Sequence, residues 1–223
     1  MIRIHVICEG QTEELFVNEL LHSHFISKGV LLIPALIGKP GHKGGNMRFE
    51  RLLSDIRSRL LGDTTAYCTT FFDFYGLPGD FPGKTESLEH SSHAVKAQCV
   101  IKAFFDKIEQ ILGKDPVRIL IPYVQMYEFE GLLFSDVQSL AIGINRPDLY
   151  GRFKVVRAVF NTPEEINDNP ETSPSKRVMK FYPGYEKPIH GALAAIEMGL
   201  EVIREQCPLF NGWLTNLENL QEE

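Results

Sequence analysis

Residues 1–13, MIRIHVICEGQTE, place an apolar run directly before an acid–glycine corner and a second acid. The run Ile2–Cys8 is rich in isoleucine and valine, which predicts a strand near the centre of a sheet. Gly10 permits a tight exit from that strand, and Glu13 suits the positive end of a following helix. We therefore expect Glu9 at the C-terminal end of a buried strand and Glu13 in the first turn of the next helix.

The composition fits a globular chain that buries a sizeable core. Of the 223 residues, 43% are hydrophobic and 23% are charged, which is ordinary for one domain or for a domain with an appendage. No apolar run approaches the roughly 20 residues that a membrane span needs, and Glu9 and Gly10 interrupt the N-terminus too early for a secretory signal. Four widely spaced cysteines without a CxxC pair indicate reduced thiols and argue against a disulfide frame or a zinc site. We expect a cytoplasmic protein that makes no membrane contact.

The formal net charge of −6 argues against a protein that coats nucleic acid by bulk charge. It does not exclude an enzyme that acts on nucleic acid, because an acidic catalytic cluster contributes several negative charges by itself. Any phosphate-binding surface must therefore be local.

Strand-like and helix-like patterns alternate through residue 135. The segments between the strands predict helices that begin near Glu13, after a cap at Asn46, and at His90, the last with Val95 and Ile111 on its inward side. The alternation predicts an α/β fold, with a mostly parallel sheet flanked by helices. Strands are expected at residues 2–8, 30–38, 66–72 and 117–126, and loops rich in glycine or proline at residues 39–46 and 75–83.

Beyond Ser135 the strand-like runs disappear. Polar loops separate helical segments, including a long helix at residues 189–207 and a shorter one at residues 209–220. We therefore expect two parts, an α/β domain at residues 1–135 and a helical extension at residues 136–223 that packs on it.

Acidic residues follow three of the expected strands. Glu9 follows the first strand, Asp73 follows the third, and Glu128 and Glu130 follow the fourth. Ligands of open parallel sheets bind at the C-terminal ends of the strands, and carboxylates gathered there repel one another and raise one another's pKa values. Mg²⁺ or Mn²⁺ relieves such repulsion and activates water for attack on a phosphate. The alternative is that these acids are solvated residues at strand termini.

A second cluster of polar residues lies between residues 172 and 187. Ser173 is a candidate helix cap with Pro174 at the first helical position, where proline is tolerated. Free N–H groups in the first turn of a helix attract anions, so this turn is a candidate site for a substrate phosphate. The alternative is a well-capped surface helix whose cations are hydrated. The candidate phosphate-binding residues are Ser175, Lys176, Arg177 and Lys187.

Several of these segments resemble Toprim domains. Residues 8–13, CEGQTE, resemble the EGxTE corner of Toprim domains, especially those of the overcoming-lysogenization-defect (OLD) type nucleases, and Asp73 resembles the first acid of the Toprim DxD motif. The chain is more similar still to a Toprim-like bacterial family associated with phage defence. That likeness is carried by DFYGLP at residues 73–78, PYVQMYEFEGLLF at residues 122–134 and TSPSKRVMKFYPGYEKPIHG at residues 172–191.

The resemblance implies a Toprim-like fold and a Mg²⁺-dependent nuclease that hydrolyses DNA or RNA. Two departures from the family pattern concern the metal site: Tyr75 stands at the second acid of DxD, and Tyr127 stands where the family has histidine. Another donor is therefore required, and Glu128, Glu130 or Asp80 is a candidate. In the resulting hypothesis the metal ligands are Glu9, Asp73 and Glu128, and Glu13 and Glu130 are further ligands or orient the attacking water.

Two other functions remain open. One is a non-catalytic Toprim-like partner subunit that binds an ATPase or nucleic acid, and the other is phosphoryl transfer on a small phosphorylated molecule. The sequence lacks a GxxxxGK[ST] motif, so nucleotide hydrolysis would need a separate ATPase partner. A homo-oligomer is also compatible with the sequence.

Overall fold

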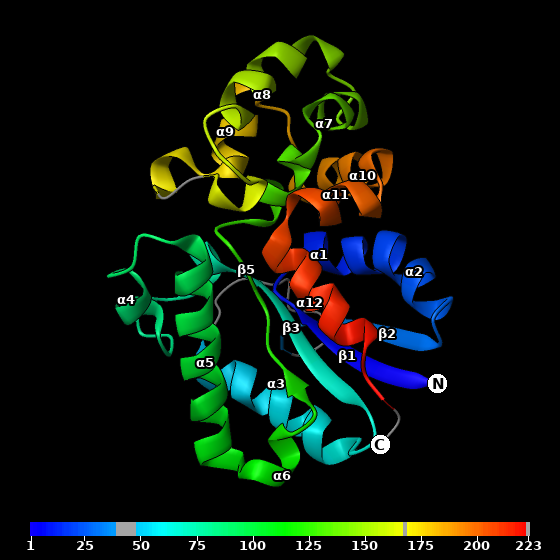
Figure 1. Ribbon diagram of the computed structural model, residues 1–223, viewed down its shortest axis with the longest axis vertical. Coiled ribbons are helices and arrows are strands. Elements are labelled where there is room, and N and C mark those ends of the chain that lie inside the picture. The colour runs from blue at the N-terminus through cyan, green and yellow to red at the C-terminus, as the bar shows by residue number, and fades with distance from the viewer. Residues whose placement is uncertain (39–47, 167–168, 222–223) are drawn as a thin grey trace.

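The computed structural model describes residues 1–38, 48–166 and 169–221. At its centre lies a parallel sheet in the order β2-β1-β3-β4, with β5 pairing with the end of β3 (Figure 1). The expected α/β class, with a parallel sheet flanked by helices, is confirmed. The strands are β1 (Ile2–Cys8), β2 (Val30–Leu36), β3 (Tyr67–Asp73), β4 (Leu120–Ile121) and β5 (Val124–Gln125).

The two inner strands carry the most apolar segments. β1 pairs with β2 on one side and with β3 on the other, and its residues Val6, Ile7 and Cys8 are fully buried. Six of the seven residues of β3 are buried as well. Because a strand covered on both faces needs apolar side chains on both, these two runs occupy the centre of the sheet.

The strand expected at residues 117–126 is wrong as a single element. Val117 ends the short helix α6 (Lys114–Val117), and the remainder is divided into β4 and β5 around Pro122. Proline has no backbone N–H to donate to the ladder. Next to it, the Thr70 side chain of β3 takes the place of the backbone hydrogen bonds between the strands. Its Oγ1 donates to the Tyr123 carbonyl at 2.7 Å and accepts from the Tyr123 N–H at 2.9 Å.

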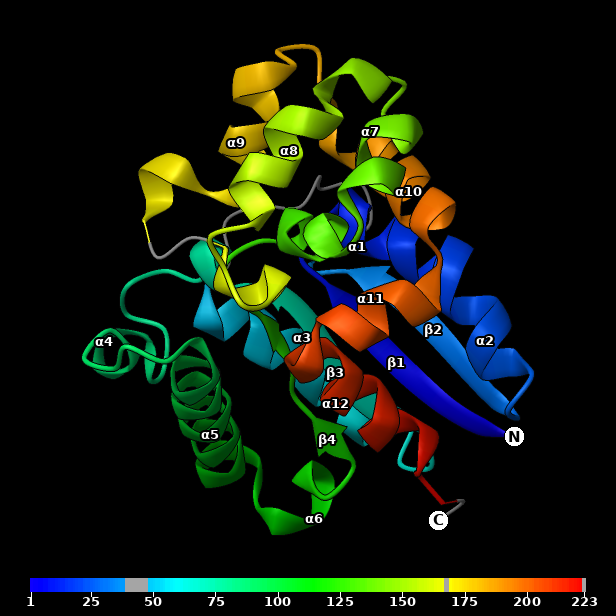
Figure 2. The same cartoon turned by 45° about the horizontal axis from the view of Figure 1, so that its top comes forward.

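Helices cover both faces of the sheet. One continuous segment is formed by α1 (Gln11–Phe16), the π-helix η1 (Val17–Leu21) and α2 (His22–Ile26). It lies on the same face as the last helix, α12 (Pro208–Glu218), whereas α3 (Phe49–Gly62) lies on the other (Figures 1 and 2). The long helix α5 (His93–Leu112) contacts β5. The expectation that Val95 and Ile111 face inward is wrong, since they are 41% and 44% exposed. The shorter elements here are η2 (Phe74–Gly76) and α4 (Lys84–Ser87).

The glycine-rich loop at residues 39–46 and its expected cap, Asn46, lie outside the described residues. The N-cap of α3 is Arg48. No described helix is long and apolar enough to span a bilayer.

After β5 the described residues form helices and no strand. The expected helix at residues 189–207 is wrong as one element, because it is divided into α10 (Lys187–Met198) and α11 (Leu200–Gln206) at Gly199, whose φ of +81° suits glycine. The helices α7, α8 and α9 form a group on the side toward which β1 and β3 run (Figures 1 and 2). The remaining elements are η3 (Phe129–Ser135), α7 (Val137–Gly143), η4 (Pro147–Leu149), α8 (Tyr150–Arg157), η5 (Pro163–Glu165), η6 (Pro170–Thr172), α9 (Pro174–Phe181) and α12 (Pro208–Glu218).

The last helix, α12, packs directly on the sheet. The Trp213 indole donates to Thr69 Oγ1 of β3 at 2.9 Å and stacks on Tyr123 with ring centroids 4.4 Å apart. The buried Glu164 carboxylate accepts the N–H groups of Leu209 and Phe210, both at 2.9 Å, and so holds the start of α12. The C-terminal helices therefore share one hydrophobic core with the sheet.

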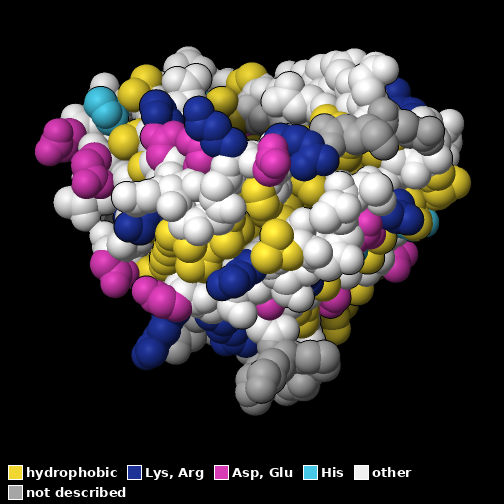
Figure 3. Space-filling view, turned by 90° about the horizontal axis from the view of Figure 1, so that it is seen from below, with side chains coloured by type: hydrophobic (Ala, Val, Ile, Leu, Met, Phe, Trp, Pro, Cys, Tyr) yellow, Lys and Arg dark blue, Asp and Glu magenta, His cyan; other side chains and the backbone are white. Residues whose placement is uncertain are grey.

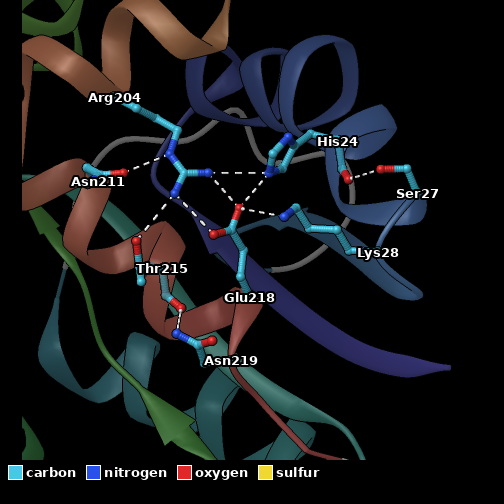
Figure 4. Close-up of polar contacts among 8 residues, drawn as sticks. All are labelled: His24, Ser27, Lys28, Arg204, Asn211, Thr215, Glu218 and Asn219. Atoms are coloured by element: carbon cyan, nitrogen blue, oxygen red, sulfur yellow. Dashed lines mark hydrogen bonds and ion pairs between the residues drawn. The ribbon is translucent and has the colours of Figure 1, made fainter.

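An ion cluster around Glu218 ties α12 to α11 and α2 (Figure 4). Arg204 approaches both oxygens of Glu218, at 2.5 and 3.1 Å, and the ring of His24 lies 2.5 Å from Glu218 Oε1. Hydrogen bonds from Arg204 lower the pKa of Glu218 to about 2. Because the ordinary carboxyl pKa is higher, this cluster stabilises the fold when Glu218 is ionised.

We expect Glu218→Gln to lower the free energy of unfolding at pH 7 by about 1.5–3 kcal/mol, the range for hydrogen bonds to charged groups. The lowered pKa means that this contribution is present above pH 4.5 and is lost as the pH falls toward 2. Urea unfolding at pH 7 and pH 3 measures it, with the exposed Glu205→Gln as the matched control. A difference between Glu218→Gln and wild type that grows on acidification would contradict this assignment.

Candidate active site

Glu9 and Asp73 lie side by side at the C-terminal edge of the sheet. Glu9 directly follows β1, Asp73 is the last residue of the neighbouring β3, and Glu9 Oε2 accepts the backbone N–H of Asp73 at 3.0 Å. The other oxygen of Glu9 lies against Gly76, where an added Cβ would sit only 2.1 Å from Glu9 Oε1. The end of β3 and the turn after it therefore hold the Glu9 carboxylate in place. The Asp73 N–H donates to one of its oxygens, and the absence of a side chain at Gly76 leaves room for the other.

Glu13 occupies the first turn of α1, as its position in the sequence predicts. Its Oε2 accepts the backbone N–H of the N-cap residue, Gly10, at 2.8 Å. The side chain therefore folds back toward the corner that carries Glu9, and the residue is 5% exposed.

Glu128 and Glu130 reach the same region from the segment after β5. Tyr127, at a left-handed φ of +60°, reverses the chain between β5 and Glu128. Glu128 Oε2 accepts the Ser175 N–H at 2.9 Å, and Glu130 is 1% exposed. The Lys187 ammonium lies 3.4 Å from Glu130 Oε2 and 4.0 Å from Glu128 Oε1.

These carboxylates lie close enough to influence one another's ionisation. Burial, followed by the charges of Glu13, Glu9 and Glu130, raises the pKa of Asp73 well above its usual range. Burial is also the main cause that raises the pKa values of Glu13 and Glu130 to about 7. Burial lowers the pKa of Lys187, but the carboxylates around it outweigh that effect and raise it overall.

Two oxygens of the cluster have no hydrogen-bond partner. Asp73 Oδ1 and Glu130 Oε1 are both buried and unpaired. Oxygen donors of this kind suit a hard divalent cation such as Mg²⁺ or Mn²⁺. In the described parts of the chain, however, no three His, Cys, Asp or Glu side chains stand in an arrangement that holds a metal ion. The residues fit such an ion chemically, and binding it would require the carboxylates to move toward one another.

Comparison with protein families places nearly the whole chain in one family. The profile of a family described as a domain of unknown function (DUF4276) matches residues 8–218, from the end of β1 to the end of α12. The chain belongs to the DUF4276 family. Comparison with curated proteins and with solved structures found no significant match. The match includes all five acids of the cluster and the helices of the extension.

The expected phosphate-binding turn of this DUF4276 domain is in part engaged already. The Ser175 N–H donates to Glu128 at 2.9 Å, so in this structure the amide is paired with a carboxylate, and its role in binding phosphate stays a prediction. Lys176 is exposed and lies 3.6 Å from Glu171, and Arg177 donates to the Thr172 carbonyl at 2.7 Å. The role of these two cations in binding phosphate stays a prediction, whereas Lys187 lies in the cluster itself.

The departures at Tyr75 and Tyr127 belong to one packing unit. Their rings lie 5.3 Å apart, and the Tyr75 N–H donates to the Tyr127 carbonyl at 3.0 Å. Asp80, a candidate donor in place of Tyr75, is exposed and lines a separate pocket with Arg48 and Pro78. Among the candidates for the additional donor, Glu128 and Glu130 are therefore the ones at the cluster.

Two residues of this site received no role from the sequence, Gly76 and Tyr185. Gly76 stands three residues after Asp73, a spacing that places it in the turn beneath a strand-end acid. Tyr185 stands in the run PGYEKP, where a turn and a proline at the second position of the next helix fix the direction of the chain. Its hydroxyl is buried and has no hydrogen-bond partner.

Proposed function

We propose that this DUF4276 protein is a metal-dependent phosphodiesterase that cleaves DNA or RNA. The observation that supports the proposal is the meeting of five carboxylates at the C-terminal edge of the sheet, two of them with buried oxygens that have no partner. Such a cluster is costly unless a cation compensates it. The likeness of residues 73–78, 122–134 and 172–191 to a Toprim-like bacterial family associated with phage defence suggests phage defence as the setting.

Each side chain has a distinct part in this proposal. Glu9, Asp73 and Glu128 would hold the ion, and Glu13 and Glu130 would orient the attacking water. A bound Mg²⁺ or Mn²⁺ would polarise the phosphate and activate that water. Lys187 would donate a hydrogen bond to a phosphate oxygen, because its ammonium already lies beside Glu128 and Glu130 of the cluster.

The substrate is expected to approach from the α9 side. Lys176 is exposed in the first turn of α9, one residue from the amide that holds Glu128. On the face seen from below, in contrast, positive and negative side chains are interspersed among hydrophobic ones (Figure 3). A local basic contact near the cluster agrees better with a net charge of −6 than binding across a broad surface.

A second candidate function has an observation of its own. The Lys187 ammonium stands between Glu130 and Glu128, where it partly compensates the carboxylates. Together with the absence of a ready metal-binding arrangement among the described residues, this favours a partner subunit without catalysis, which binds nucleic acid or an ATPase. A measurement of metal binding distinguishes the phosphodiesterase from the non-catalytic partner subunit.

We expect millimolar Mg²⁺ or Mn²⁺ to raise the unfolding temperature, and more so at pH 8 than at pH 5.5. Without metal, the pKa values of about 7 for Glu13 and Glu130 mean that the folded protein binds more protons than the unfolded chain, so stability falls as the pH rises from 4.5 through 7. A cation that displaces these protons offsets the loss. An ion present at 100 times its Kd contributes about 2.7 kcal/mol, or about 5–10 °C for a chain of this size.

Thermal unfolding in EDTA, Mg²⁺ and Mn²⁺ at both pH values measures this effect, and cleavage of end-labelled DNA and RNA is followed in parallel. Ca²⁺ serves as a control for a general effect of divalent ions on the surface. Unfolding temperatures that are the same in EDTA and Mn²⁺ at pH 8, without cleavage, would exclude the phosphodiesterase and favour the partner subunit.

A further inference from the structure

Tyr185 is held firmly in the turn between α9 and α10. Its N–H donates to the Tyr182 carbonyl at 3.0 Å, and its ring stacks on His190 at 5.6 Å with an interplanar angle of 24°. The residue is 6% exposed. The direction of its hydroxyl is therefore fixed by the turn and by the stacked ring.

The hydroxyl lies where three elements meet beside the acidic cluster. An added Cβ on Gly191 of α10 would lie 3.4 Å from the Tyr185 hydroxyl, 3.4 Å from Thr12 Cγ2 and 3.2 Å from the Phe129 ring. Thr12 immediately precedes Glu13, and Phe129 stands between Glu128 and Glu130. The hydroxyl thus lies near the chain segments that include Glu13, Glu128 and Glu130.

The hydroxyl is also buried without a hydrogen-bond partner. A polar group in that state costs about 1–3 kcal/mol, and phenylalanine would fill the same space without this cost. Burial, with the charges of Glu130 and Glu128, raises the pKa of Tyr185 well above its usual value, so the group keeps its proton and is a donor. The structure therefore contains a buried neutral donor without a partner, near enough to Glu128 and Glu130 for their charges to raise its pKa.

We propose that Tyr185 contacts the substrate in this site. Its hydroxyl donates a hydrogen bond to an oxygen of the same phosphate group that Lys187 binds. This inference rests on the proposed phosphodiesterase function. Tyr185 and Lys187 come from the same short segment, and both are close to Glu128 and Glu130. A fixed neutral donor beside an ammonium stabilises the negative charge that grows on the phosphate oxygens during attack by water.

The test compares Tyr185→Phe with Tyr182→Phe. Both remove one hydroxyl from the same turn, but Tyr182 is half-buried and packs against Arg146 at 5.3 Å, away from the carboxylates. Single-turnover cleavage of an end-labelled oligonucleotide with Mn²⁺ is expected to slow about a hundredfold in Tyr185→Phe, as for the loss of one transition-state donor. Tyr182→Phe should keep the wild-type rate. The unfolding temperature of Tyr185→Phe should not fall, because an unpaired buried hydroxyl has been removed.

Binding of inorganic phosphate in the presence of Mn²⁺, measured by calorimetry, gives a readout that needs no turnover. We expect Tyr185→Phe to bind phosphate about tenfold more weakly than wild type. Wild-type rates and phosphate affinity in Tyr185→Phe would overturn the assignment of Tyr185 and leave the phosphodiesterase intact. A wild-type protein that neither cleaves nucleic acid nor binds phosphate with Mn²⁺ would overturn both.

Discussion

Asp73→Asn is expected to reduce metal-dependent cleavage about a thousandfold or more, as for the loss of a central catalytic group, without lowering the unfolding temperature. Asp73 is the last residue of β3, and its Oδ1 is buried without a partner. Burial and the charges of Glu13 and Glu9 raise its pKa well above the usual range. Asparagine has nearly the same volume and carries no charge, so the substitution removes the proposed ligand and the repulsion together.

The matched control for Asp73→Asn is Glu14→Gln. Glu14 is a half-buried acid on α1 next to Glu13, outside the cluster. We expect Glu14→Gln to keep both the cleavage rate and the stabilisation by Mn²⁺. Cleavage within a few fold of wild type in Asp73→Asn would remove Asp73 from the proposed ligands. A large fall in unfolding temperature would instead assign it a structural role.

The second large effect is expected for Gly76→Ala. The new Cβ would lie 2.1 Å from Glu9 Oε1 and 2.4 Å from Glu9 Oε2, so the carboxylate must leave its place against the turn. A displacement of about 1 Å in a catalytic group costs about a hundredfold in rate, and we expect a loss of that order. Stabilisation by Mn²⁺ should fall with it, which thermal unfolding with and without Mn²⁺ measures.

Gly79→Ala provides the control in the same loop, because an added Cβ at Gly79 meets no atom within 4 Å. It should cleave at the wild-type rate. If Gly76→Ala and Gly79→Ala behave alike, the Glu9 carboxylate does not depend on the space that Gly76 leaves, and its proposed position in the site is wrong.

The sequence predicted those parts of the fold that depend on local pattern. β1 begins and ends where the apolar run at residues 2–8 does, and Glu13 falls in the first turn of α1. Interactions between distant residues were less accessible. The division at Pro122 depends on Thr70, which supplies two hydrogen bonds from another strand, and no pattern within residues 117–126 reveals that partner.

The same limit applies to the candidate site. Acids at the ends of parallel strands indicated which carboxylates meet, since strand ends share one edge of the sheet. The sequence did not indicate that Glu128 accepts a hydrogen bond from the Ser175 N–H, because the two residues are 47 positions apart. In the sequence, Glu128 looked suited to a metal ion and Ser175 to a phosphate. Tyr185 lies in the segment 172–191 that carries the family likeness, but the sequence does not show that its hydroxyl is buried without a partner near Glu130.

The position of α12 over β3 bears on how this protein matures during synthesis. Trp213 and Phe210 close the core over Phe71, with ring centroids 5.2 and 6.5 Å from it. A nascent chain that has left the ribosome only as far as residue 207 exposes that side of β3 to water. The sheet that carries the acidic edge is therefore covered on this side late in translation, after all five carboxylates have emerged.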